Sequence, residues 1–225
     1  MDTFNDDDEV QKLKDWWKQN WQPVLLGLGL SVGGVLGWNA WQSHTQNVAE
    51  RASGHYEQLR LSLSKGDLEE AREARQALVD EYPDTPYAAQ AALMMASYHV
   101  QISDSQTAIA HLEWASENAD DDRLRYIATL RLARLLWAQD DNEAALELLQ
   151  GDDQDAFAPL YAELRGDILL SQKKIDEART AYEQALALSK ESDEGNKQLY
   201  SNVTLIQKLN DLGVTTPNSS EGEAS

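Results

Sequence analysis

An uncharged stretch close to the N-terminus limits more than any other feature what this chain can fold into. The 19 residues from Pro23 to Trp41 carry no ionisable side chain. At about 1.5 Å per residue, a helix of that length approaches the ~30 Å thickness of a bilayer's hydrocarbon core. The run is too long for an ordinary buried core helix, so the sequence predicts a transmembrane helix over residues 21–42.

The glycines of this stretch raise a second interpretation, a phosphate-binding loop. A dinucleotide-binding loop needs G-x-G-x-x-G after a strand, and Gly27 and Gly29 fit, but Val32 stands in place of the third glycine. A Walker loop needs a lysine before Ser or Thr, and no lysine lies between Lys18 and Lys65. Neither kind of phosphate site is therefore expected.

The residues that flank the stretch favour lipid. Five of the seven tryptophans lie at its two ends, where indole rings suit the membrane interface: Trp16, Trp17, Trp21, Trp38 and Trp41. A cleaved signal peptide would have a shorter apolar region and a small-x-small cleavage site, which "NAWQSH" does not offer. We therefore expect an uncleaved, single-pass anchor.

Basic residues predict its orientation. Lys12, Lys14 and Lys18 precede the stretch, whereas Arg51 alone follows it within 15 residues. Lysine and arginine accumulate on the cytoplasmic side of a membrane helix. The short segment 1–20 is therefore expected in the cytoplasm, and the large C-terminal part on the opposite side.

Three glycines in the stretch recur every four residues and so share one helix face: Gly29, Gly33 and Gly37. Small residues at this spacing let a second transmembrane helix approach closely. The pattern predicts a contact face for a partner helix. The alternative interpretation is that glycine is simply frequent in membrane helices.

Beyond the anchor, the chain is expected to be all-α and repetitive. Apolar residues recur every three or four positions, and pairs of small residues 12 apart predict the points where the helices of a hairpin cross: Ala96 and Ala108, Ala133 and Ala145, Gly166 and Ala178. We predict a repeat domain over 45–211, with hairpins near 49–83, 86–119, 122–151 and 157–190, a capping helix over 195–211 and a disordered tail over 212–225.

These hairpins resemble the tetratricopeptide repeat, a helix–turn–helix unit of about 34 residues, although no unit has the tryptophan of its consensus. The whole arrangement resembles the YfgM family of Gram-negative bacteria, chiefly through "VGGVLGWNAWQSH" (32–44) and "AELRGDILLSQ" (162–172). The resemblance implies an inner-membrane protein with a periplasmic tetratricopeptide-like α-solenoid. Its expected partners are the SecYEG translocon, a PpiD-like chaperone and chains in transit.

A second function stays open beside this one. Anchored the other way, the repeats would lie in the cytosol and capture precursor proteins or chaperone tails. Nucleic acid is disfavoured as a partner, since the net charge of −20 repels phosphates. No small-molecule substrate is expected.

No residue pattern predicts an enzyme, a cofactor or a metal. Two Ser-x-x-Lys matches, Ser62/Lys65 and Ser171/Lys174, fall at expected hairpin turns. His99 occupies a core position of its repeat. Neither acidic cluster, 120–122 or 152–155, supplies both the glycine and the glutamate of a calcium loop, so their aspartates are expected to cap helices.

A binding groove is expected along the first helix of each hairpin. The residue after each crossing residue, and the one a turn further on, should face it. In this chain these are Arg60, Leu63, Ser97, Val100, Arg134, Trp137, Asp167 and Leu170. Arginine, tryptophan and aliphatic side chains together suit a peptide or a partner helix.

Overall fold

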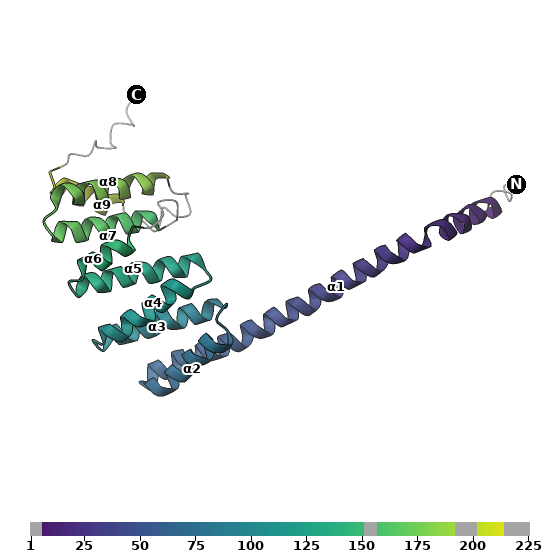
Figure 1. Cartoon of the computed structure of the whole chain (residues 1–225), viewed down its shortest axis with the longest axis horizontal. Helices are drawn as coiled ribbons and strands as arrows, with labels where there is room; N and C mark the ends of the chain where they lie inside the picture. The colour runs from purple at the N-terminus through teal and green to yellow at the C-terminus, as the bar shows by residue number, and fades with distance from the viewer. Residues whose placement is uncertain (1–5, 151–156, 192–201, 214–225) are drawn as a thin grey trace, which may run out of the picture. The chain divides into compact units, whose positions relative to one another are not determined.

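The computed structural model describes residues 6–150, 157–191 and 202–213, which form helices and turns and contain no strand (Figure 1). The chain divides into two units, 1–51 and 52–225. The first helix, α1 (Asp6–Lys65), begins in the first unit and ends in the second. The other helices are α2 (Leu68–Glu81), α3 (Pro86–Gln101), α4 (Ser105–Asn118), α5 (Asp122–Ala138), α6 (Asn142–Leu148), α7 (Ala158–Ser171), α8 (Ile175–Glu191) and α9 (Asn202–Asp211).

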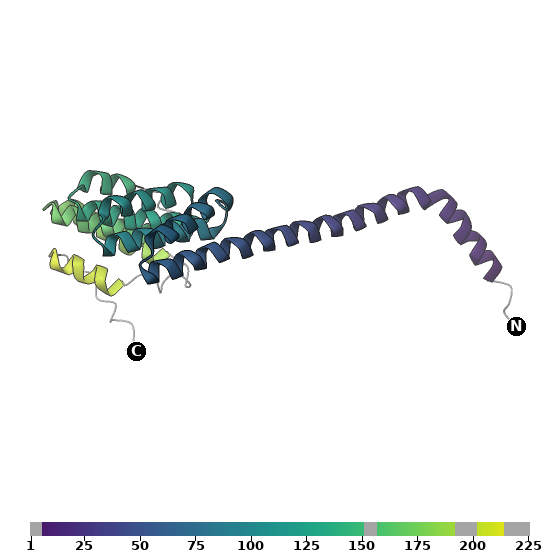
Figure 2. The ribbon, with the colours of Figure 1, turned by 90° about the horizontal axis from the view of Figure 1, so that it is seen from below.

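The N-terminal unit consists of the first part of α1, which bends near Pro23 (Figure 2). Proline removes a backbone hydrogen bond and kinks a helix. Among the described residues, no single helix is long and apolar enough to span a membrane. The two segments Val10–Pro23 and Leu25–Lys65, which are bent by 49° relative to each other, reach that length and hydropathy only when taken together. The transmembrane helix over 21–42 stays a prediction.

The second unit stacks helices in successive rows from α2 to α8 (Figure 1). Its core is made largely of alanine and leucine, in clusters that bridge neighbouring helices. The predicted crossing residues are all buried, and so are the bulky residues four positions after the second of each pair: Leu112, Leu149 and Tyr182. Small residues let two helix backbones approach, and the all-α repeat fold is therefore confirmed.

The turn inside each helix pair has one backbone design. The residue two positions before the following helix adopts a left-handed conformation: Gly66, Ser103, Asp140 and Lys173. The next N–H then donates to a carbonyl five residues back, as Asp104 does to His99 at 2.8 Å. This closes the preceding helix with a Schellman-type motif. In three of the turns, the residue that follows the left-handed one is also the N-cap of the next helix, and its carboxylate accepts a backbone N–H. These residues are Asp67, Asp104 and Asp141.

The C-terminal predictions fall partly outside the described residues. Of the predicted capping helix, 202–211 is described as α9, and 195–201 is not described. Leu205 and Leu209 of α9 are buried in a cluster with Tyr182 and other residues of α7 and α8. Of the predicted tail, Leu212 and Gly213 form a turn, and 214–225 lies outside the described residues.

Candidate functional site

A pocket of about 360 Å³ lies between α3 and α5, the first helices of two consecutive pairs, with Leu112 of α4 also lining it. On each of the two helices the lining residues follow i, i+3, i+4, i+7 spacing, which brings them onto one face. The α3 face consists of Leu93, Ala96, Ser97 and Val100. The α5 face consists of Arg131, Arg134, Leu135 and Ala138.

The pocket is apolar, with positive charge on one side only. Leu93, Ala96 and Leu112 are buried, whereas Val100 is 48% exposed. Arg131 and Arg134 are exposed on α5, three residues apart, and neither forms an ion pair with another described residue. A ligand that fits here combines an apolar group with negative charge.

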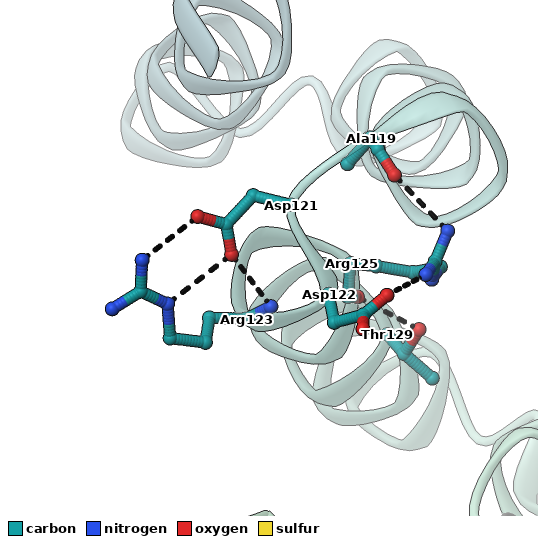
Figure 3. Close-up of polar contacts among 6 residues, drawn as sticks. All are labelled: Ala119, Asp121, Asp122, Arg123, Arg125 and Thr129. Atoms are coloured by element: carbon teal, nitrogen blue, oxygen red, sulfur yellow. Dashed lines mark hydrogen bonds and ion pairs between the residues drawn. The ribbon is translucent and has the colours of Figure 1, made fainter.

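Two other arginines of α5 are already paired, as Figure 3 shows. Arg123 donates to both carboxylate oxygens of Asp121, through Nη2 at 2.9 Å and Nε at 3.2 Å. Arg125 contacts Asp122 and donates through Nη1 to the carbonyl of Ala119 at 3.1 Å. Asp121 also accepts the Arg123 backbone N–H at 2.8 Å, which confirms that this aspartate caps a helix.

Three of the eight predicted groove residues line this pocket: Ser97, Val100 and Arg134. Trp137 lies instead against α7, where its Nε1 donates to Ser171 Oγ at 3.3 Å and its ring packs on the cluster that contains Ile168. Arg60 is exposed on α1 and pairs with Glu57, its Nε donating at 2.8 Å. Leu63, near the end of α1, is half-buried.

The last two predicted groove residues are engaged within the domain. Asp167 accepts the Tyr182 hydroxyl at 2.7 Å and Lys208 Nζ of α9 at 2.6 Å. Lys208 also donates to Glu163 at 2.7 Å. Burial lowers the pKa of Lys208, but its bonds to Asp167 and Glu163 outweigh burial and raise that pKa overall. Leu170 packs against the cluster that contains Leu205 and Leu209.

The predicted membrane residues are all accessible within the N-terminal unit. The five tryptophans are 45% to 62% exposed. A Cβ atom added at Gly29, Gly33 or Gly37 would meet no atom within 4 Å. The structure thus leaves this glycine face open, and its role as a helix contact stays a prediction.

Three polar residues named in the sequence analysis, Ser62, Ser171 and His99, make hydrogen bonds or polar contacts within the domain. Ser62 donates to the carbonyl of Gln58 at 2.9 Å, and Ser171 to that of Ile168 at 2.7 Å. His99 is 1% exposed, which confirms its core position, and its Nδ1 lies 3.0 Å from Asp104 Oδ2. No cluster of three potential metal ligands occurs among the described residues. The acidic cluster 152–155 lies outside them.

Sequence reasoning missed part of the pocket. Arg134 was selected because it follows the crossing residue Ala133. Arg131, Leu135 and Ala138 lie on the same helix face as Arg134, at positions −3, +1 and +4 relative to it. Spacing from Arg134 would have found them. No pattern would have found the pairing of Asp167 with Lys208, because the two lie 41 residues apart and on different helices.

Known proteins resemble the chain over most of its length. A family model described as a tetratricopeptide repeat-like domain matches residues 14–214. The "Ancillary SecYEG translocon subunit" of Aggregatibacter actinomycetemcomitans is 31% identical over 183 residues, 81% of this chain and 89% of that protein. The protein of the same name from Escherichia coli strain K12 is 31% identical over 80% of this chain and 86% of its own length.

Among solved structures, "MamA 41-end from Desulfovibrio magneticus RS-1" is 17% identical, with a TM-score of 0.49 over 72% of this chain and 83% of that one. The family model and the two relatives each cover well over two thirds of the chain. The chain therefore belongs to the family of ancillary SecYEG translocon subunits, built on a tetratricopeptide repeat-like domain.

Proposed function

We propose that this protein is a non-enzymatic scaffold of the bacterial inner membrane. Its single N-terminal helix anchors it, and its repeat domain lies in the periplasm. There it binds the SecYEG translocon and a PpiD-like chaperone and assists exported proteins. One observation carries the proposal: relatives about 31% identical over four fifths of the chain are named ancillary SecYEG translocon subunits.

The structure supports a binding role for the repeat domain. Stacked helix pairs present an extended surface, and this one has an apolar pocket with two arginines that form no ion pair with another described residue. The uncharged stretch with its tryptophan-rich ends supports the anchor.

Orientation is tested by fusing reporters after Ser225. Alkaline phosphatase folds to an active enzyme outside the cytoplasm, and green fluorescent protein fluoresces when it folds inside. We expect phosphatase activity without fluorescence. Fluorescence without phosphatase activity would contradict the periplasmic placement and favour the alternative, a receptor whose repeats capture precursors or chaperone tails in the cytosol.

Partner binding is tested by purifying the full chain from membranes in a mild detergent and identifying what copurifies. We expect translocon subunits and a membrane-anchored chaperone. An unrelated single-pass inner-membrane protein, purified at the same level, is the control. Recovery of translocon subunits in equal amounts with both proteins would contradict the proposed association.

A further inference from the structure

We propose that the pocket between α3 and α5 binds an acidic, amphipathic segment of a partner protein. An apolar side chain of that segment enters the pocket, and neighbouring carboxylates pair with Arg131 and Arg134. The inference rests on the proposed function, because it specifies the chemistry of the partner that such a scaffold holds.

The shape of the pocket favours a side chain as its occupant. Its volume of about 360 Å³ suits one or two apolar side chains rather than a folded domain. The buried part of the lining is apolar because Ala96 and Leu112 have aliphatic side chains. The half-exposed Val100 extends this apolar surface to the rim. Burying an apolar side chain here removes area from water at roughly 25 cal/mol per Å².

The charge of the pocket is opposite to that of the chain as a whole. The sequence has 39 acidic and 19 basic residues, yet the lining contains two arginines and no carboxylate. A negative segment is repelled by most of the surface and attracted here, whereas a basic segment experiences the reverse. Complementary charge of this kind selects partners and their register.

Within the described part of the chain, the two arginines differ from the other exposed arginines of the second unit because neither forms an ion pair. The other exposed arginines described in the second unit, 52–225, each pair with a nearby acid: Arg60 with Glu57, Arg72 with Glu69 and Arg123 with Asp121. Arg131 and Arg134 form no such pair within the described residues. Because they are three residues apart on α5, their guanidinium groups can engage two carboxylates spaced along one segment.

The test uses the full chain in detergent and fluorescence anisotropy of two labelled synthetic peptides. In one peptide, pairs of leucine alternate with pairs of glutamate, and in the other glutamine replaces every glutamate. We expect the glutamate peptide to bind at least about tenfold more tightly, since charged hydrogen-bonded pairs add to apolar contact. The preference should shrink as salt is raised.

Variants place the binding in the pocket. Arg131→Glu/Arg134→Glu should reduce affinity for the glutamate peptide at least about tenfold. Arg72→Glu/Arg123→Glu is the matched control, with the same change of net charge at two exposed arginines outside the pocket. Val100→Gln, at an exposed position, should weaken binding of both peptides through lost apolar contact. Circular dichroism checks that every variant is folded.

Several results would overturn the inference. These are equal affinity for the two peptides, equal loss in the pocket and control variants, or concentration-dependent self-association in place of peptide binding. Copurification of the translocon with the wild-type chain is measured in parallel. If the translocon copurifies and the glutamate peptide is not preferred, the pocket inference fails and the proposed function stands. If the glutamate peptide is preferred but the translocon does not copurify, the proposed function fails and the preference of the pocket for an acidic segment stands.

Discussion

Gly166 of α7 lies so close to Tyr182 of α8 that a methyl group added to its Cα would sit 2.5 Å from ring atoms Cδ1 and Cε1. The tyrosine is fully buried, and its hydroxyl donates to Asp167. The equivalent crossings of earlier hairpins pair an alanine with a leucine: Ala96 with Leu112, and Ala133 with Leu149. The last hairpin thus combines a smaller residue with a larger ring.

Gly166→Ala should lower the free energy of unfolding. Overpacking a core costs about 1–3 kcal/mol, whereas replacing a mid-helix glycine by alanine gains about 1 kcal/mol. The clashing atoms belong to a buried, hydrogen-bonded ring rather than to the end of a flexible chain. We therefore expect a net loss, measured by chemical denaturation of the full chain in detergent.

Tyr182→Leu supplies the control, because Gly166→Ala/Tyr182→Leu recreates the alanine–leucine pair of the earlier hairpins. In the Tyr182→Leu background, Gly166→Ala should be neutral or stabilising. An equal destabilisation in both backgrounds would show that the tyrosine ring is not the cause.

This crossing illustrates what the sequence can predict. The 12-residue spacing of small residues identified the hairpins, because close helix packing restricts those positions to glycine or alanine whatever the partner. The left-handed turn residues could not be found one by one, since Ser103, Asp140 and Lys173 carry side chains that rarely adopt that conformation. What Ser103, Asp140 and Lys173 share with Gly66 is their position, two residues before the following helix.

The pocket was predictable in part for the same reason. Helical spacing gives the face of a residue, so Ser97, Val100 and Arg134 were found on the side that lines the pocket. Whether that face stays open depends on distant segments. Asp167 occupies the same repeat position as Arg134, yet α9 brings Lys208 to it, and no local pattern contains that contact.

Asp104→Ala should destabilise the fold more than Asp141→Ala. Both carboxylates cap a helix by accepting a backbone N–H, from Thr107 at 3.2 Å and from Ala144 at 3.2 Å. Losing such a cap costs about 1 kcal/mol. Asp104 also contacts Nδ1 of the buried His99, which its loss leaves unpaired at a further cost of about 1–3 kcal/mol. Equal losses in thermal or chemical denaturation would contradict a role for the His99 contact.

Lys208→Met should loosen the attachment of α9. It leaves Glu163 and Asp167, each about one quarter exposed, without their shared countercharge. We expect a loss of about 1–3 kcal/mol, between the values for exposed and buried pairs. Lys190→Met, at an exposed lysine near the end of α8, is the control, and Glu163→Gln should recover part of the loss. Hydrogen exchange of α9 amides measures the effect directly.

The sign of the lysine effect with pH follows from its pKa. Because that pKa is raised in the folded state, the ion pairs contribute fully below the ordinary lysine value of about 10.4. Their contribution disappears as the pH rises from that value through the folded-state pKa. The stability difference between wild type and Lys208→Met should therefore be constant at neutral pH and shrink in alkali.

His111 should make the repeat domain sensitive to mild acid. Burial, together with Arg75, His99 and Arg72, lowers its pKa to about 4, although Asp104 opposes this. A lowered histidine pKa gives stability that is present above about pH 6.5 and is lost as the pH falls through about 4. Because the ring is partly exposed, solvent screening limits the expected loss of folding free energy to on the order of 1–2 kcal/mol.

The variant His111→Gln cannot bind that proton. As the pH falls from 6.5 to 4, the free energy of unfolding of this variant should therefore rise relative to that of wild type. Chemical denaturation at each pH measures this difference. His44→Gln, at an exposed position of α1, is the control. A constant difference between wild type and His111→Gln across this range would contradict the burial of His111.

Replacing Gly29, Gly33 and Gly37 together by leucine should weaken copurification with membrane partners and leave insertion intact. Apart from the helix's own backbone, no described atom lies within 4 Å of a Cβ placed at any of the three, so the structure leaves room for a larger side chain there. Leucine is also more favourable than glycine in an apolar helix. Its bulk would close the groove through which a partner helix approaches. Substituting Leu28, Val32 and Leu36 by isoleucine changes the same helix without filling that groove and is the control. If the glycine variant copurifies translocon subunits as well as wild type does, the repeat domain carries the association, and the glycines serve the helix only as small residues.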